Sequence, residues 1–251
     1  MKLLAALFVL LALLAPSRDS RAEGSKGSFE LWVHQGLATQ SLKDWNDEYD
    51  TINQGLAFFG VQGDVNTFGN SIPYGAELGY RLTPGMSLAV GYTHQSALTE
   101  NGFVDHVGFL IEDVPSTFES RDEITFDKIS AILGLEIGRT GLTLWGELGY
   151  GFSKAESFVS ITPNATPSSP VVYGTSTWDG NAMVGSVALG LRRELGGRSM
   201  IRARVGYQMA DMGELEGPAG PPLNFMGVPK GTDFSGIHIS GAIGIILTNV
   251  R

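Results

Sequence analysis

This 251-residue chain has no cysteine, few basic residues and no long apolar run beyond its first 22 residues. The lack of cysteine excludes disulfide bonds, a lipid anchor on a cysteine and metal sites built from thiolates. The 26 acidic and 17 basic residues give a formal net charge of −9, which argues against nucleic acid as a partner. After residue 22, no segment has the roughly 20 continuous apolar residues of a membrane helix. Any membrane crossing by the rest of the chain would therefore be made by strands.

The first 22 residues have the pattern of a secretory signal peptide. Lys2 is followed by an apolar run over residues 3–15, which ends at Pro16. Small residues, Ser20 and Ala22, stand on either side of Arg21 before the expected cleavage point. A transmembrane anchor is the alternative, but the run is too short for one. We predict a signal peptide over residues 1–22 and one exported domain over residues 28–251.

Residues 128–153 show the clearest alternation of apolar and polar side chains. The alternation passes through a turn at residues 138–141 and then resumes. A period of two predicts two β-strands joined as a hairpin, each with one apolar and one polar face. The apolar face would pack in a core in a soluble sandwich, and would meet lipid in a membrane barrel. Its members are Ile129, Ala131, Leu133, Leu135, Ile137, Leu142, Leu144, Leu148, Tyr150 and Phe152.

Two further hairpins and two single strands repeat this design, so that the chain has eight predicted strands. They lie over residues 28–37, 73–95, 182–211 and 234–248. The turns inside the hairpins are short, whereas the other connections are long. The long connections lie around residues 39–71, 97–126, 156–180 and 212–233. Short turns on one rim and long loops on the other are typical of an outer-membrane barrel, and a soluble sandwich gives no reason for them.

The architecture and the glycine-tyrosine hairpins resemble the small eight-stranded outer-membrane barrels, a group that includes the OmpA transmembrane domain, OmpX and the opacity proteins. The hairpin sequence GAELGY at residues 75–80 is echoed by GELGY at residues 146–150. The resemblance covers the whole predicted domain. It implies an all-β, antiparallel, up-and-down barrel in the outer membrane of a Gram-negative bacterium, surrounded by outer-membrane lipid.

The polar faces of the predicted strands carry charges of both signs. An eight-stranded barrel is just wide enough for side chains to fill its interior. Because buried charge must be paired to be tolerated, we predict a polar plug of ion pairs, with a narrow gated channel as the alternative. The predicted lumen charges are Glu30, Glu77, Arg81, Lys128, Glu136, Glu147, Arg192, Glu194, Arg202 and Arg204.

Apolar residues three and four apart predict an amphipathic helix over residues 41–59, inside the first long connection. Ser41 and Asp44 would form a capping box at its start, and Gly60 would end it. The polar side is acidic, whereas helices that lie on anionic lipid favour basic residues there. We therefore predict that the helix caps the barrel mouth, with a place in the membrane interface as the alternative. Its predicted apolar face consists of Leu42, Trp45, Tyr49, Ile52, Leu56 and Phe59.

The other long connections have distinct compositions. The one around residues 97–126 and its flank is acidic, and clustered carboxylates attract hard cations. Its spacing matches no calcium loop, however, so we expect a solvated acidic face. Residues 162–170 are rich in proline, and Leu223, Phe225 and Met226 could contact a partner or fold back onto the rim. The acidic residues are Glu100, Asp105, Glu112, Asp113, Glu119, Asp122, Glu123 and Asp127.

One short motif raises the question of catalysis. His238 and Ser240 resemble the His-x-Ser of outer-membrane lipid A deacylases, which also need a downstream glutamate to orient the histidine. No acidic residue follows Asp233, and the period of two places both side chains on the lumen face. The four histidines show no metal-ligand spacing. We therefore predict no enzyme activity, no catalytic or metal site and no cofactor.

The expected function is that of a monomeric structural barrel whose long loops contact an extracellular ligand or surface. A narrow channel or small-molecule conduit is the main alternative, and a lipid-modifying enzyme is a distant one. The predicted partners are therefore outer-membrane lipid and an extracellular ligand, with no nucleic acid.

Overall fold

The computed structural model describes residues 27–249, apart from residues 62, 64, 107, 109, 112, 113, 139, 165–171, 197 and 224–226. The predicted signal peptide lies outside the described residues. Within the described part of the chain, no helix is both long enough and apolar enough to cross a membrane.

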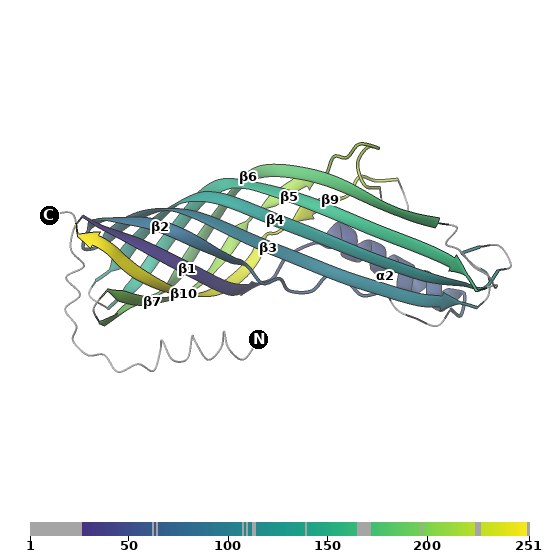
Figure 1. The fold of residues 1–251 in the computed structure, drawn as a ribbon, viewed down its shortest axis with the longest axis horizontal. Helices are drawn as coiled ribbons and strands as arrows, with labels where there is room; N and C mark the ends of the chain where they lie inside the picture. The colour runs from purple at the N-terminus through teal and green to yellow at the C-terminus, as the bar shows by residue number, and fades with distance from the viewer. Residues whose placement is uncertain are drawn as a thin grey trace.

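Eight antiparallel strands close into a barrel in the order β1-β10-β7-β6-β5-β4-β3-β2 (Figure 1). Short turns join β2 to β3, β4 to β5 and β6 to β7, and β10 closes the ring against β1. The strand bounds are β1 Ser28–Ala38, β2 Tyr74–Thr83, β3 Met86–Asp105, β4 Ser116–Ile137, β5 Leu142–Pro163, β6 Val172–Gly196, β7 Ser199–Met209 and β10 Gly236–Asn249. The eight-stranded all-β barrel predicted from the alternation is confirmed.

The two faces of the barrel differ in polarity. Ile129, Leu133 and Leu148 point outward from β4 and β5 and are exposed. Glu30 and Trp32, which alternate with outward residues on β1, are each 2% exposed and point into the lumen. A closed sheet with an apolar exterior and a polar interior is the arrangement that crosses a membrane.

Tyrosine hydroxyl groups mark the level at which the outer surface changes from apolar to polar. Tyr92 on β3 donates a hydrogen bond of 2.5 Å to Asp127 on β4, and Tyr150 on β5 donates one to Asn181 on β6. Such rings favour membrane boundaries because one end is apolar and the other is wet. We place the boundary of the lipid-facing surface at these residues.

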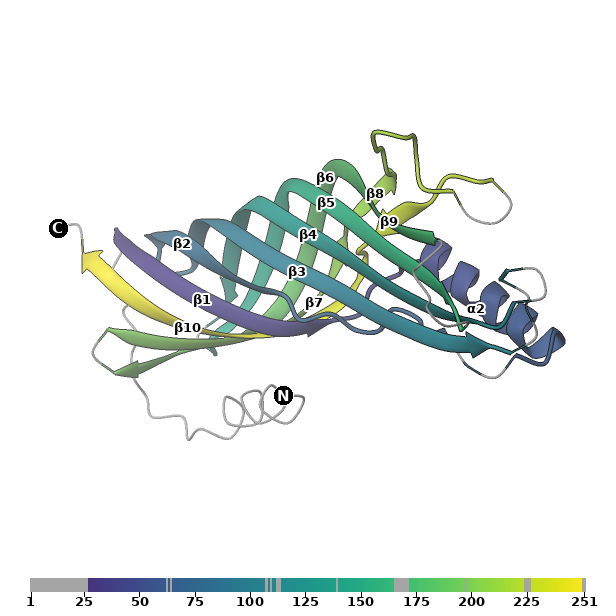
Figure 2. The same ribbon diagram turned by 45° about the vertical axis from the view of Figure 1, so that its right-hand side comes forward.

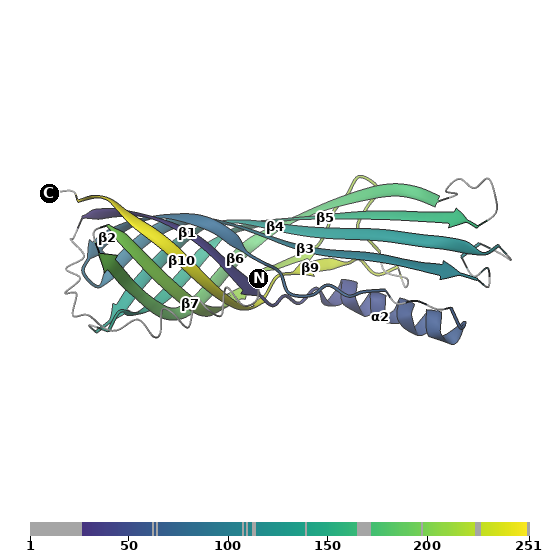
Figure 3. The same cartoon turned by 60° about the horizontal axis from the view of Figure 1, so that its bottom comes forward.

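Four strands continue beyond this boundary and form an extension of the sheet. Strands β3 to β6 have 20 to 25 residues, whereas β1, β2, β7 and β10 have 10 to 14. Figure 3 shows these long strands running on past the ends of the others. The predicted long connections around residues 97–126 and 156–180 are therefore wrong over most of their length, because these residues are strands with turns only at their tips.

The alternation in the extension is inverted with respect to the barrel. Phe103, Ile124 and Phe126 point inward and are buried, whereas Glu100 and Arg121 point outward. Beyond the membrane the outer face meets water, so the polar residues move to that face and the apolar residues pack inside. This inversion looks like a break in the strand pattern when only the sequence is read.

The predicted helix is α2, Lys43–Phe58, and it lies alongside the extended strands (Figures 2 and 3). Its first turn follows Leu42 without a side-chain cap, so the predicted capping box is wrong. Asp44 instead accepts a 3.0 Å hydrogen bond from the backbone N–H of Gly231. The predicted stop is confirmed, because Gly60 adopts a φ of 70° and the next N–H, of Val61, donates to the carbonyl of Leu56 at 2.9 Å.

A second, two-stranded sheet lies in the last long connection, where no strand was predicted. It pairs β8, Asp211–Glu214, with β9, Gly231–Asp233. The helix is tied to β9, because the indole N–H of Trp45 donates to the carbonyl of Gly231 at 3.1 Å. Beside it, Lys230 lies over the ring of Trp45 at 3.9 Å and pairs with Glu48. The helix and the small sheet thus hold each other beside the extension.

Candidate functional site

The polar residues of the lumen form three ion-pair clusters, and the first is centred on Glu30 near the end of the barrel that carries the short turns. Arg192 donates two hydrogen bonds to this carboxylate, one of 2.6 Å to Oε1 and one of 2.8 Å to Oε2. Arg81 adds an ion pair of 3.3 Å from Nε to Oε1, and the indole N–H of Trp32 donates at 3.2 Å. Paired hydrogen bonds from one guanidinium are among the stronger polar contacts in proteins.

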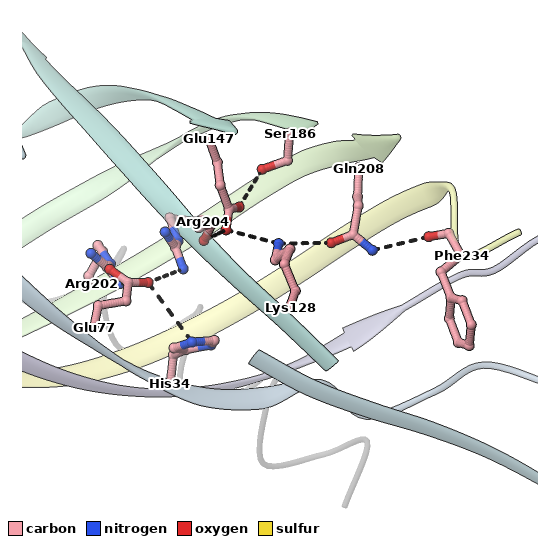
Figure 4. A network of polar contacts seen from close by, with 10 residues as sticks. His34, Glu77, Lys128, Glu147, Ser186, Arg202, Arg204, Gln208 and Phe234 are labelled. Carbon is pink, nitrogen blue, oxygen red and sulfur yellow. Dashed lines mark hydrogen bonds and ion pairs between the residues drawn. The ribbon is translucent and has the colours of Figure 1, made fainter. Parts of the chain in front are cut away.

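The second cluster is centred on Glu77 in the middle of the barrel (Figure 4). Its Oε1 accepts hydrogen bonds from Arg202 at 2.7 Å and from Arg204 at 2.8 Å. The guanidinium of Arg202 also lies over the rings of Trp32, at 4.6 Å, and Trp145, at 5.6 Å. Two aromatic faces and one carboxylate thus hold this buried cation in place.

The third cluster lies nearer the extension and contains Lys128 and Glu147. The Lys128 Nζ lies 2.9 Å from Glu147 Oε1 and donates to Gln208 Oε1 at 3.0 Å. Ser130 and Ser186 donate to the two oxygens of Glu147, the latter at 2.6 Å. Figure 4 shows the chain of contacts continuing through Gln208, which donates at 3.2 Å to a backbone carbonyl at the top of the lumen. Both oxygens of this carboxylate are therefore occupied.

Two small polar cavities lie on either side of the Glu77 cluster. The cavity nearer the short turns, the lower cavity, has a volume of about 30 Å³. The cavity nearer the extension, the upper cavity, has a volume of about 40 Å³. Both are lined by Glu77. Several buried polar atoms beside them have no hydrogen-bond partner among the described residues, namely Glu77 Oε2, His34 Nε2, His238 Nδ1, Arg202 Nε and Arg204 Nε. His34 Nε2 lies 4.0 Å from Glu77 Oε1, a contact marked by a dashed line in Figure 4. Unpaired buried polar atoms next to a cavity of this size are sites for a bound water molecule or ion.

An apolar core begins above the third cluster and closes the lumen on the side of the extension. We call its first layer, the rings of Phe126 and Phe234, the roof. Phe126 of β4 stacks on Phe234 at 4.8 Å between ring centroids, and Phe234 also lines the upper cavity. Gly151 makes this packing possible, because a Cβ there would lie 2.5 Å from the Phe126 ring. The core continues through the extension to α2. Its buried members are Leu42, Trp45, Tyr49, Leu56, Val61, Val65, Phe68, Ala97, Phe103, Ile124, Phe126, Ala155, Val184, Ala210, Met212, Leu215 and Phe234.

A buried polar contact joins α2 to the extended strands inside this apolar core. The hydroxyl of Tyr49 on α2 donates to Asp122 on β4 at 2.5 Å, and both residues are buried. Burial and the neighbouring Asp122 carboxylate raise the pKa of Tyr49 well above its usual value, so the phenol stays protonated and remains a donor. The hydrogen bond fixes the position of α2 on the extension.

The structure brings together eight of the ten predicted lumen charges in the three clusters. Glu136 and Glu194 instead lie half-buried at the short-turn rim, and none of the ion pairs in the three clusters includes them. The predicted apolar face is buried at Leu42, just before α2, and at Trp45, Tyr49 and Leu56 on the helix, and Ile52 packs partly against the same core. Phe59 is 49% exposed and lies outside that face.

Three residues of the lumen network were not assigned as site residues from the sequence. Trp32 and Trp145 flank Arg202, and Gln208 links Lys128 to the roof. The signal for Trp145 was present, since it shares its strand parity with Thr143 and Glu147. Its partners could not be identified in this way, because they come from strands far away in the sequence.

The acidic residues around residues 97–127 do not form one cluster. Asp105 and Asp122 point inward, and Asp105 accepts a 2.7 Å hydrogen bond from the N–H of Leu110. Glu100, Glu119 and Glu123 lie on the outer face of the extension, and Glu112 and Asp113 lie outside the described residues. Among the described residues, no group of three or more histidine or acidic side chains could hold a metal ion.

His238 and Ser240 both lie on the lumen face of β10. Ser240 is buried, and both residues line the upper cavity. A lipid acyl chain outside the barrel would therefore be separated from them by the barrel wall.

No family model matches the sequence, and no curated protein matches it. Several solved structures do match. One is the attachment invasion locus protein Ail of Yersinia pestis, solved in complex with sucrose octasulfate. Its sequence is 10% identical to this chain and its TM-score is 0.43, and the match covers 89% of this chain and all of Ail. OprG of Pseudomonas aeruginosa is 10% identical with a TM-score of 0.41, and the match covers 89% of this chain and 98% of OprG. Neisserial surface protein A is 13% identical with a TM-score of 0.38, and the match covers 87% of this chain and 97% of that protein. These are small eight-stranded outer-membrane barrels. The fold assigned to this chain rests on its own strand register.

Proposed function

We propose that this protein is a sealed barrel of the Gram-negative outer membrane, which spans the membrane as a monomer and presents its extension to an extracellular ligand or surface. The observation that carries the proposal is the double closure of the lumen. Ion pairs fill it from Glu30 to Glu147, and the roof at Phe126 and Phe234 covers it. An open pore would require both barriers to be removed.

The two barriers resist opening for different physical reasons. Separating a buried ion pair leaves each charge without its partner in a medium of low dielectric constant, which costs several kcal/mol per ion. Opening the roof exposes large aromatic side chains to water, at roughly 25 cal/mol per Å² of apolar surface. A gated channel would have to meet both costs in one motion, and so the plug is the better supported of the two alternatives.

The contact function is supported by an edge of the extension. Strand β6 pairs with β7 only from Gly185 onward, while residues 174–178 pair with β5 on their other side. Beyond the bridge between Asp179 and Glu216, the described residues place no strand beside this edge. Its free backbone groups can form hydrogen bonds with an extended segment of another protein. We propose this edge as the contact surface.

Conductance in planar lipid bilayers tests the sealed lumen. The detergent-folded protein is first checked by its gel mobility with and without boiling, which reports the closed barrel. We expect no sustained conductance steps after insertion. Sustained, ion-selective steps would instead favour the gated channel.

Adhesion of cells that display the protein tests the contact surface. The N–H of Asp179 donates to Glu216, on the side of β6 away from β5. Because backbone groups alternate along a strand, the N–H of Thr175 points to this same free edge and that of Ser176 points to β5, so Thr175→Pro removes an edge donor. Thr175→Pro should keep the heat-dependent gel shift and lose adhesion to surfaces coated with serum proteins, whereas Ser176→Pro should disturb the pairing with β5. Thr175→Ala, which keeps the backbone donor, is the control. Unchanged adhesion of the folded proline variant would refute the contact surface.

A further inference from the structure

The charges of the lumen do not balance at every level. Around and above Glu77, the buried cations are Arg202, Arg204 and Lys128, whereas the buried carboxylates are Glu77 and Glu147. This part of the lumen therefore carries one excess positive charge. Protonation of His34 or His238, which line the same space, would only increase it.

The short-turn end of the lumen does not supply the missing negative charge. There, Glu136 and Glu194 interact with Arg81, and Glu30 already holds two arginines. These two glutamates are half-buried at the rim, where water screens them. The Glu77 cluster and the two tryptophan rings lie between this rim and the upper cavity. An uncompensated charge in a buried site of this kind is strongly unfavourable.

The upper cavity has the shape and the donors for a compensating anion. Lys128 and Arg204 line it, together with His34, which is 6% exposed. Arg204 Nε, His34 Nε2 and His238 Nδ1 are buried without a hydrogen-bond partner among the described residues, and His34 Nε2 lies 4.0 Å from Glu77 Oε1. Glu147 also lines the cavity, but Lys128 pairs with this carboxylate and the two serines donate to its oxygens, so its charge is compensated locally.

We propose that this cavity binds one small monovalent anion of the halide class. Its volume of about 40 Å³ has room for about three water-sized particles, at about 10–15 Å³ each, and therefore for one halide ion with one or two water molecules. The ion lies on the side of Arg204 and Lys128, and a water molecule separates it from the free Oε2 of Glu77. The anion stabilises the plug and is independent of the extracellular contact proposed above.

Bromide in crystals of the detergent-folded protein gives a direct test, because it scatters anomalously. We expect an anomalous difference peak in the upper cavity, within hydrogen-bonding distance of Arg204 or Lys128. A map from well-diffracting crystals with no peak there would overturn the proposal. A peak confined to the outer surface would do the same.

Thermal unfolding in detergent gives the second test, with sodium bromide compared with sodium gluconate at equal ionic strength. A ligand that binds only the folded state raises the melting temperature in a saturable way. We expect this for the wild type in bromide, and an affinity at least about tenfold weaker in Arg204→Gln, as for loss of one charged hydrogen bond. Lys128→Gln also removes the excess charge and serves if Arg204→Gln does not fold. The control is Arg121→Gln on the exposed outer face, which should respond as the wild type does. Equal melting temperatures of the wild type in the two salts would refute the anion.

Discussion

Strands β3 to β6 pass through two regions that are built in opposite ways. In the barrel, their outward residues such as Leu133 and Leu148 are apolar, and their inward residues include the charged pair Lys128 and Glu147. In the extension, the inward residues Ile124 and Phe126 are apolar, and Arg121 and Glu123 point outward. The difference teaches that the surroundings of the outer face decide where apolar residues go. The period of two stays the same throughout.

The two regions also differ in what holds them closed. The lumen relies on ion pairs between residues far apart in the chain, such as Glu77 and Arg202, which are 125 positions apart. The extension relies on an apolar core with α2 packed against it and on local hydrogen bonds, such as the buried one between Tyr49 and Asp122. Damage to the lumen should therefore affect the whole barrel, whereas damage to the extension should stay local.

The largest effect is expected for Glu77→Gln in the lumen. The change leaves Arg202 and Arg204 without their carboxylate, and breaking a buried ion pair costs roughly 3–5 kcal/mol. We expect the midpoint of urea unfolding of the detergent-folded protein to fall by a corresponding amount. Glu100→Gln, on the exposed outer face of the extension, should leave the midpoint unchanged. Equal effects of the two changes would mean that the lumen pairs do not stabilise the barrel.

A smaller effect is expected for Leu133→Arg on the lipid-facing surface. An arginine on that face of a barrel costs roughly 2–4 kcal/mol near the membrane midplane. The yield of folded protein in lipid vesicles, measured by the heat-dependent gel shift, should fall. Leu98→Arg is the matched change, because Leu98 is exposed on the outer face of the extension. It should fold as well as the wild type, and equal losses for both variants would show that the boundary between the two regions is misplaced.

A local effect is expected for Tyr49→Phe in the extension. The variant leaves Asp122 buried without its donor, which should destabilise α2 by about 1.5–3 kcal/mol, as for other hydrogen bonds to charged groups. Hydrogen exchange of the α2 amides should become faster, while the gel shift of the barrel stays the same. Loss of the gel shift would show that the two regions unfold together.

The smallest effect is expected for Lys154→Gln on the outer face of the extension. Lys154 pairs with Glu156 at 2.5 Å, and this hydrogen bond raises the pKa of Lys154 above its usual value. Because the lysine is exposed, solvent screens the pair. Neither the urea midpoint nor the exchange of the α2 amides should change. A clear shift in either would mean that the outer face contributes to holding the extension closed.

The sequence predicts the barrel well because its signal is local. Alternation in residues 128–153 is sufficient to assign both strands, their turn and the lipid-facing side chains. It also identifies which charges point inward. It does not identify their partners, because the pairing of Arg192 with Glu30 depends on how the ring closes and on the level of each strand within it.

The extension was missed for a related reason. Residues 116–126 contain a regular strand, but the positions of the polar and apolar residues are exchanged there, which resembles a loop. The start of α2 was misjudged because Asp44 bonds to β9, a strand of three residues too short to predict. In both cases the deciding interaction is made with a part of the chain that local patterns do not reveal.

The length of the extended strands determines how far from the membrane surface a binding partner can contact this protein. The part of β4 beyond the barrel runs from Ser116 to Phe126. At about 3.3 Å per residue, this segment is roughly 30 Å long, which is its height above the membrane boundary if it runs along the membrane normal. The free edge of β6 is carried to a similar height on a wall stiffened from behind by α2. A large partner can then approach from the side, above the crowded layer of lipid headgroups, without displacing a single lipid.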